Sequence, residues 1–168
     1  PRRMKGEHAT SNIPDKEQIV EREPQGVGTV ISPWNFPFNL SGRAVAPAVA
    51  AGNTVVLKPA TDTPVVGGLL FARLFEEAGF PDGVLNVVTG PGSEIGDRVA
   101  SHPSSDVVSF TGSTDVGRHV AALAGENLAV PAMELGGNNA HIVTHDADLD
   151  AAVDAGVFGS FIHQGQVC

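Results

Sequence analysis

Short apolar runs alternate along the chain with longer stretches whose apolar residues recur at helical spacing. The runs are rich in valine, have the length of strands and cover residues 26–32, 53–59, 84–89 and 106–110. The stretches after them predict helices near residues 40–51, 63–79, 93–101 and 115–124. Because a continuous apolar run indicates a strand buried on both faces, this alternation predicts a parallel sheet with helices on both sides.

Proline and glycine mark where the predicted helices begin, bend and end. For the second helix, Thr63 is the expected N-cap, Pro64 suits the first position and Gly79 suits the end. Pro47 lies inside the first helix, which we therefore expect to be bent or broken.

An amphipathic helix is also predicted from about residue 148 to residue 162, and three aspartates stand at its start. Carboxylates are favoured beside the exposed amides of a helix N-terminus, so we interpret Asp146, Asp148 and Asp150 as capping residues. Aspartates also ligate divalent cations, but capping is the favoured interpretation and we expect no metal site.

The order of these elements predicts an α/β fold, a doubly wound parallel-sheet domain of the Rossmann-like, nucleotide-binding kind. Ligands of such domains bind beyond the carboxyl ends of the strands. The loops expected at those ends are PWNFP (33–37), KPATDTP (58–64), TGPG (89–92) and FTGS (110–113). The sequence therefore predicts that any binding site is assembled from these four loops.

Charge narrows the range of partners. The 168 residues include 10 basic and 19 acidic groups, for a formal net charge of −9. Residues 1–24 form a polar arm, or the remnant of a preceding element, and hold five groups of each sign, so the remainder carries all of the net charge. Such an acidic domain argues against nucleic acid and anionic membranes as partners. No apolar stretch is long enough to predict a membrane span or a signal peptide.

The single cysteine, Cys168, excludes a disulfide within the chain. Its thiol is therefore inert filler, a metal ligand or a reactive group, and the absence of paired cysteines fits the reducing cytoplasm, where we expect the protein to be located.

Five motifs in order resemble those of the aldehyde dehydrogenase superfamily. They are PWNFP (33–37), KPA (58–60), FTGST (110–114), ELGGN (134–138) and GQVC (165–168). The resemblance runs from about residue 26 to residue 168, and HQGQVC with ELGGNN looks most like the branch that oxidises aromatic aldehydes such as benzaldehyde or vanillin.

The resemblance implies three catalytic residues for NAD(P)-dependent oxidation of an aldehyde to an acid. An aldehyde carbon must first become tetrahedral before it releases hydride, and the thiolate of Cys168 is implied to make that adduct. The side-chain amide of Asn35 and the backbone N–H of Cys168 are implied to stabilise its oxyanion. Glu134 is implied to activate the water that hydrolyses the resulting thioester. A buried filler cysteine, a turn-forming Asn35 and a solvated Glu134 are the structural alternatives.

A dinucleotide site is implied as well. Lys58 matches the family's contact to the adenosine ribose, and Gly112 with Ser113 opens a helix whose free amides suit a pyrophosphate. The other positions implied to line the site are Ser32, Pro33, Trp34, Thr61 and Gly92.

Cofactor preference stays open between NAD and NADP. Thr61 stands where many NAD-preferring members carry a glutamate, and without that carboxylate nothing repels a 2'-phosphate. No arginine lies nearby in sequence to bind such a phosphate, so NAD is slightly favoured.

The resemblance divides the chain into an NAD(P)-binding domain at residues 25–134 and the start of a catalytic domain at residues 135–168. Family members continue well beyond the cysteine, so we expect the domain to be incomplete and the isolated chain to have little or no dehydrogenase activity. The complete protein is expected to be a homo-oligomer acting on a small aldehyde. The alternative is a truncated, non-catalytic nucleotide-binding module of the same family.

Overall fold

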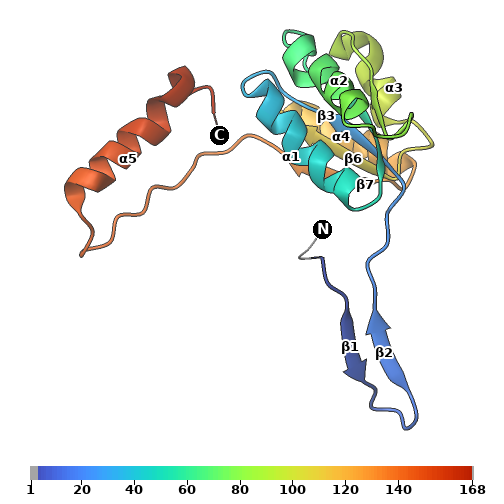
Figure 1. The fold of residues 1–168 in the computed structure, drawn as a ribbon. Coiled ribbons are helices and arrows are strands. Elements are labelled where there is room, and N and C mark those ends of the chain that lie inside the picture. The colour runs from blue at the N-terminus through green and yellow to red at the C-terminus, as the bar shows by residue number, and fades with distance from the viewer. Residues whose placement is uncertain (1–3, 168) are drawn as a thin grey trace.

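Five parallel strands form the central sheet of the computed structural model, which describes residues 4–167 (Figure 1). In spatial order the sheet reads β5-β4-β3-β6-β7, and every neighbouring pair is parallel. The strands are β3 (Val27–Ile31), β4 (Thr54–Lys58), β5 (Leu85–Val87), β6 (Val107–Thr111) and β7 (Val130–Glu134). The predicted parallel α/β sheet is confirmed.

The strand order reverses at the middle of the sheet. From β3 the chain moves outward through β4 to β5, then crosses back to β6 on the other side of β3 and continues to β7. The loops that follow β3 and β6 therefore leave the sheet in opposite directions, and in doubly wound folds the ligand crevice lies at this reversal, beyond the carboxyl ends of the strands. This is the doubly wound arrangement that the sequence predicts.

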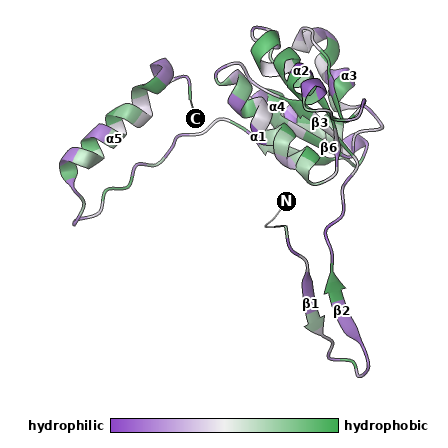
Figure 2. Ribbon diagram, viewed as in Figure 1, coloured by the Kyte–Doolittle hydropathy of each residue, from purple (hydrophilic) through white to green (hydrophobic). Residues whose placement is uncertain are grey.

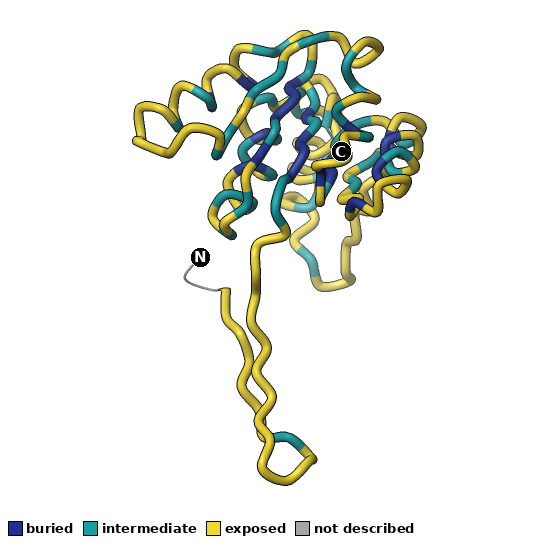
Figure 3. The backbone as a smooth tube through the Cα atoms, turned by 90° about the vertical axis from the view of Figure 1, so that its right-hand side faces the viewer, coloured by how far each residue is buried: buried dark blue, intermediate teal, exposed yellow. Residues whose placement is uncertain are grey.

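Helices cover both faces of the sheet and enclose two apolar clusters. Helix α1 (Pro37–Ala50) contacts β3 and β4, and α2 (Leu70–Glu77) contacts β5. Helix α4 (Thr114–Glu126) contacts β6, β7 and the short α3 (Asp97–Ala100). The cluster beside α1 contains Val30, Val45, Val55, Leu57 and Phe71, and the cluster beside α4 contains Ala100, Val108, Phe110, Val120, Ala124 and Ala129. The three central strands, β3, β4 and β6, contain most of the buried strand residues (Figure 3).

The predicted N-cap at Thr63 is only partly confirmed. Its carbonyl accepts the amide of Gly67 at 3.0 Å, but its buried hydroxyl has no hydrogen-bond partner within the described residues. The helix opens with a π-helical turn, Val65–Leu69, before α2 begins. In that turn Gly68 packs so closely on Pro59 that an added Cβ would lie 2.6 Å from the Pro59 ring. The wide turn is accommodated because glycine allows this approach.

Two other helix predictions are confirmed only in part. A bend or a break was expected at Pro47, and the break is excluded because helix α1 starts at Pro37 and continues through Pro47 to Ala50. Pro47 lies near the end of the helix, where its missing N–H removes a single bond, the one to the Arg43 carbonyl. The predicted helix 93–101 is instead a π-helical turn, Gly92–Gly96, followed by the four residues of α3.

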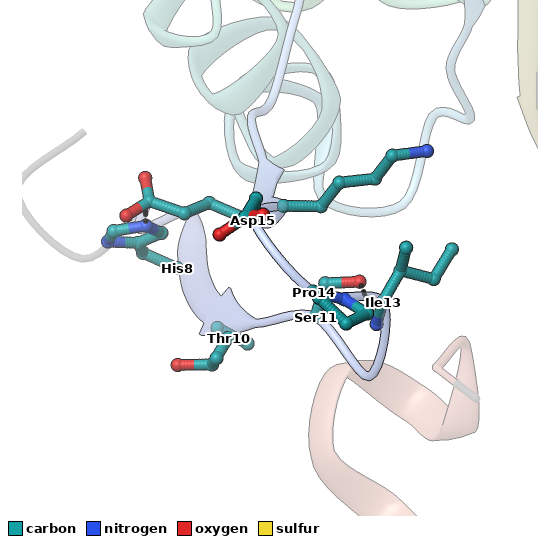
Figure 4. Close-up of a pocket in the computed structure, with 9 residues that line it drawn as sticks. His8, Thr10, Ser11, Ile13, Pro14 and Asp15 are labelled. Atoms are coloured by element: carbon teal, nitrogen blue, oxygen red, sulfur yellow. Dashed lines mark hydrogen bonds and ion pairs between the residues drawn. The ribbon is translucent and has the colours of Figure 1, made fainter.

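The N-terminal arm is an antiparallel hairpin of β1 (Glu7–Thr10) and β2 (Glu17–Val20) that projects from the sheet (Figure 1). Asn53 holds the backbone where the arm joins β3, because the Asn53 Oδ1 accepts hydrogen bonds from the amides of Gln25 and Gly26 at 2.7 and 3.0 Å. A hollow of about 770 Å³ lies at the hairpin turn, beside the 3.1 Å contact between His8 and Glu17 (Figure 4). This hollow is remote from the crevice of the sheet.

Residues 135–148 run without regular structure to α5 (Leu149–Phe161) and a short 3-10 turn, Ile162–Gly165 (Figure 1). The predicted cap is confirmed at Asp148, whose Oδ1 accepts the amides of Asp150 and Ala151 at 3.0 and 3.1 Å. No helix among the described residues is long and apolar enough to cross a membrane.

Helix α5 is not amphipathic, contrary to the sequence prediction. Only Asp150, Asp154 and Ser160 among its 13 residues have polar side chains. Figure 2 colours the ribbon of α5 by the hydropathy of these residues. Its large apolar side chains are all exposed, namely Leu149, Val153, Val157, Phe158 and Phe161. A helix that is apolar on most of its sides is normally buried, so α5 presents a surface suited to packing against further protein.

The first prediction concerns Leu57, which is fully buried in β4. Leu57→Ala leaves a cavity beneath α1 and is expected to lower the free energy of unfolding by about 2–5 kcal/mol in urea denaturation followed by circular dichroism. Leu128→Ala is the control, because Leu128 is 92% exposed and its truncation is expected to cost less than about 0.5 kcal/mol. Equal losses for the two variants would contradict the location of the core.

Candidate functional site

A buried chain of hydroxyl groups anchors the loop that follows β3. The Ser41 hydroxyl donates to the Gly67 carbonyl at 2.7 Å, so the Ser32 hydroxyl, 2.7 Å from Ser41 Oγ, is the donor in that pair. The Ser32 amide also donates to the Lys58 carbonyl at 3.1 Å. These bonds join the end of β3 to α1 and to the π-helical turn, and they fix where residues 33–35 begin.

The loop places Asn35 against the C-terminal segment. Its Nδ2 donates to the Gln166 carbonyl at 2.7 Å, and the neighbouring Phe36 ring lies 5.0 Å from the His163 ring. The structure thus joins the PWNFP loop to the GQVC motif across most of the sequence. Cys168 itself lies outside the described residues. Of the other loop positions, Pro33 is half-buried and Trp34 is 46% exposed.

The turn before Gln166 has an unusual backbone. His163 and Gln164 have φ values of 53° and 59°, and Gly165 follows at 74°. Three successive residues in the left-handed region reverse the chain sharply after α5. The reversal brings the Gln166 carbonyl back to Asn35.

Glu134 is the last residue of β7. Its carbonyl accepts the amide of Gly112 at 3.1 Å, which fixes its backbone beside the end of β6. Its side chain is exposed, and Oε1 lies 2.9 Å from Nη2 of Arg43 on α1. The sequence motifs did not identify Arg43, since its only signal is a basic residue on the helix that follows PWNFP.

Lys58 ends β4 and is 4% exposed. Its Nζ donates to the Pro59 carbonyl at 3.2 Å, and burial lowers the pKa of the ammonium group from 10.5 because the charged form loses solvation. Nearby, the exposed Thr61 hydroxyl donates to the Gly90 carbonyl at 3.4 Å and links the loops after β4 and β5. Gly92 is exposed at the start of the turn after β5.

Gly112 and Ser113 connect β6 to α4. A Cβ on Gly112 would lie 2.6 Å from the Phe110 ring, so any larger residue at this position would have to displace that buried ring. Ser113 is the N-cap of α4 in extended conformation and makes no side-chain cap bond. The first amides of α4 are therefore left for another acceptor, and they form an electropositive edge suited to an anion.

The parallel sheet brings these groups to one edge. Lys58 and Glu134 are the last residues of β4 and β7. The segments that directly follow β3 and β6 contain Ser32 to Asn35 and Gly112 with Ser113 respectively. β3 and β7 are separated by β6 alone, about 10 Å apart at two strand spacings. No group of three or more metal-ligating side chains is assembled within residues 4–167.

This edge combines an amide donor, a carboxylate, a buried ammonium group and a helix N-terminus, as in an enzyme that binds an anionic cofactor. The family model for aldehyde dehydrogenases matches residues 1–168, and the chain belongs to the aldehyde dehydrogenase family.

Two relatives share about half of its residues. The chain is 56% identical over 170 residues to a vanillin dehydrogenase of Corynebacterium glutamicum, covering 100% of this chain and 35% of the relative. It is 53% identical over 168 residues to a benzaldehyde dehydrogenase of Bacillus subtilis, again covering 100% of this chain and 35% of the relative. The chain thus spans about a third of the length of these relatives.

Solved structures agree with the fold. An NAD-dependent benzaldehyde dehydrogenase from C. glutamicum matches with a TM-score of 0.88 and 55% identity, over 99% of this chain and 37% of that one. An NADP-dependent enzyme from E. coli matches with a TM-score of 0.91 and 42% identity, over 99% of this chain and 34% of that one.

The second prediction uses the burial of Lys58. Between its lowered folded-state pKa and 10.5, the unfolded chain binds more protons at this residue, so Lys58 makes the free energy of unfolding rise with pH. Lys58→Met removes this dependence. Its free energy of unfolding relative to wild type is therefore expected to fall as the pH approaches 10.5 in urea titrations.

Lys16→Met, which removes an exposed lysine of the hairpin, controls for the loss of a lysine. If the free energy of unfolding of Lys58→Met relative to wild type stays constant or rises over this pH range, burial of the Lys58 charge does not affect stability.

Proposed function

We propose that the natural protein containing this chain oxidises an aldehyde to a carboxylic acid with NAD or NADP, through the thiol of Cys168. The observation that carries the proposal is the 2.7 Å bond from the Asn35 amide to the Gln166 carbonyl, two residues before the cysteine. Membership of the aldehyde dehydrogenase family supports it. The relatives named for vanillin and benzaldehyde favour an aromatic aldehyde as substrate.

The residues at the crevice fit a dinucleotide. Lys58 supplies a compact cation for ribose hydroxyls, and the uncapped start of α4 at Gly112 and Ser113 supplies amides for the pyrophosphate. We assign residues 25–134 to this binding domain, with Ser32, Pro33, Trp34, Thr61 and Gly92 as further lining. When bound, the cofactor supplies a hydride acceptor.

In the proposed chemistry the Cys168 thiolate adds to the aldehyde carbon, and the carbonyl oxygen takes up the negative charge. The Asn35 amide has two N–H groups, one of which donates to Gln166. The other is free to donate to the oxyanion, together with the Cys168 amide. A single donor of this kind is typically worth about 3–4 kcal/mol of barrier.

Loss of hydride leaves a thioester on Cys168. Water then adds to the acyl carbon while Glu134 accepts a proton from it. The carbon–sulfur bond breaks, which releases the acid and restores the Cys168 thiolate. We assign Glu134 as this base, and residues 135–168 as the beginning of the catalytic part of the protein. NAD is favoured slightly over NADP.

The third prediction tests these roles in the whole natural protein with benzaldehyde and either cofactor. Cys168→Ala is expected to abolish aldehyde oxidation, and Asn35→Ala to lower kcat about 100- to 1,000-fold through the lost oxyanion donor. Glu134→Gln is expected to retain a first-turnover burst of reduced cofactor but to turn over slowly, because the thioester accumulates.

Glu77→Gln is the matched control, since Glu77 is an exposed glutamate paired with an arginine on α2. If Cys168→Ala oxidises aldehyde at the wild-type rate, the proposed function is overturned. A wild-type protein that binds dinucleotide without oxidising any aldehyde would favour a binding module instead.

The fourth prediction concerns cofactor choice. Thr61 is exposed beside Gly90, and Thr61→Glu would place a carboxylate where a 2'-phosphate approaches. We expect kcat/KM with NADP to fall at least about tenfold while kcat/KM with NAD is retained or rises. Thr61→Gln, which has nearly the same size without charge, separates repulsion from steric effects. Equal losses for both cofactors in Thr61→Glu would count against this site for the ribose.

A further inference from the structure

An ion pair at the crevice has no role in the chemistry described so far. Arg43 Nη2 lies 2.9 Å from Glu134 Oε1, and the side chains are 56% and 62% exposed. Pairs this exposed add little to stability because solvent screens them. The pair does place the Arg43 guanidinium at one oxygen of the Glu134 carboxylate.

This pair differs from the other two arginine–carboxylate pairs found within residues 4–167. Arg73 with Glu77 and Arg118 with Asp115 each join residues one turn apart on the same helix. Arg43 instead reaches from α1, above β3 and β4, to the far end of β7. Of these three arginine pairs in the described part of the chain, this is the one that connects two separate elements, α1 and β7.

Both backbones in the pair are firmly held. On α1, Ser41 and Val45 are fully buried, and a Cβ on Gly42 would lie 3.3 Å from the Phe71 ring. On β7, Glu134 is paired with Thr111 of β6, and its carbonyl is bound by Gly112. The ion pair therefore joins two side chains whose backbones are both held in place.

We propose that Arg43 is a positioning residue for Glu134. This inference rests on the proposed function, in which Glu134 accepts a proton from the hydrolytic water. The guanidinium binds one carboxylate oxygen and limits rotation of the side chain, so the other oxygen, Oε2, faces the water. Arg43 would then accelerate hydrolysis of the thioester without affecting its formation.

The test uses the whole natural protein and three variants. Arg43→Gln removes the charge, Arg43→Lys keeps it, and Arg73→Gln removes an exposed paired arginine on α2 as the matched control. We expect Arg43→Gln to keep the burst of reduced cofactor and the KM for aldehyde while its steady-state kcat falls on the order of 10- to 100-fold. Arg43→Lys should recover part of the rate, and Arg73→Gln should match wild type.

A second readout does not depend on activity. Crystal structures should place the Glu134 carboxylate in one orientation in wild type and in several, or a different one, in Arg43→Gln. An unchanged kcat or an unchanged Glu134 orientation in Arg43→Gln would overturn the proposal, as would a loss of the burst, which would place Arg43 before the thioester. If Arg43→Gln fails to fold, wild-type turnover by Arg43→Lys with a displaced carboxylate would overturn it too.

The outcomes also separate this proposal from the proposed function. A wild-type protein without aldehyde oxidation would overturn both. Slow turnover in Glu134→Gln together with wild-type turnover in Arg43→Gln would overturn only the role of Arg43.

Discussion

Parallel pairing of the five strands is the constraint on which the whole site depends. Because all five strands point the same way, Lys58 and Glu134 at the ends of two strands and Asn35 and Gly112 just after two others come to one edge. The reversal of strand order between β3 and β6 then keeps the loops after these two strands from filling the space between them. The sheet therefore both gathers the polar groups and leaves room for a ligand among them.

Stability and chemistry compete at this edge. Lys58 is buried at the end of β4 although burial disfavours its charge. The hydroxyl chain from Ser32 through Ser41 to Gly67 satisfies the buried hydroxyls of both serines where the loop leaves the sheet. A hydrogen-bonded support thus lies beside a buried charge whose own placement is unfavourable.

Much of the sheet could be predicted from the sequence, because valine-rich runs and their following helices are local signals. The π-helical turn after Pro64 could not, since it depends on Gly68 meeting Pro59, a contact that spacing does not encode. The prediction that α5 is amphipathic was wrong for another reason. The aspartates at its start indicate a cap, but they do not give the helix a polar face. The family motifs pointed to Asn35 and to the GQVC segment, but not to the bond between the Asn35 amide and the Gln166 carbonyl. Arg43 was missed because nothing in the sequence tells which carboxylate a long, flexible side chain will reach.

The left-handed turn at residues 163–165 limits how this region can diverge among related proteins. Valine, isoleucine and threonine are poorly tolerated at positive φ, whereas glycine, asparagine and aspartate are accepted there. Mutational drift at these positions is therefore filtered by backbone geometry, independently of any contact their side chains make. Limited sequence variation at residues 163–165 would then reflect the backbone conformation as much as the chemistry of the nearby cysteine.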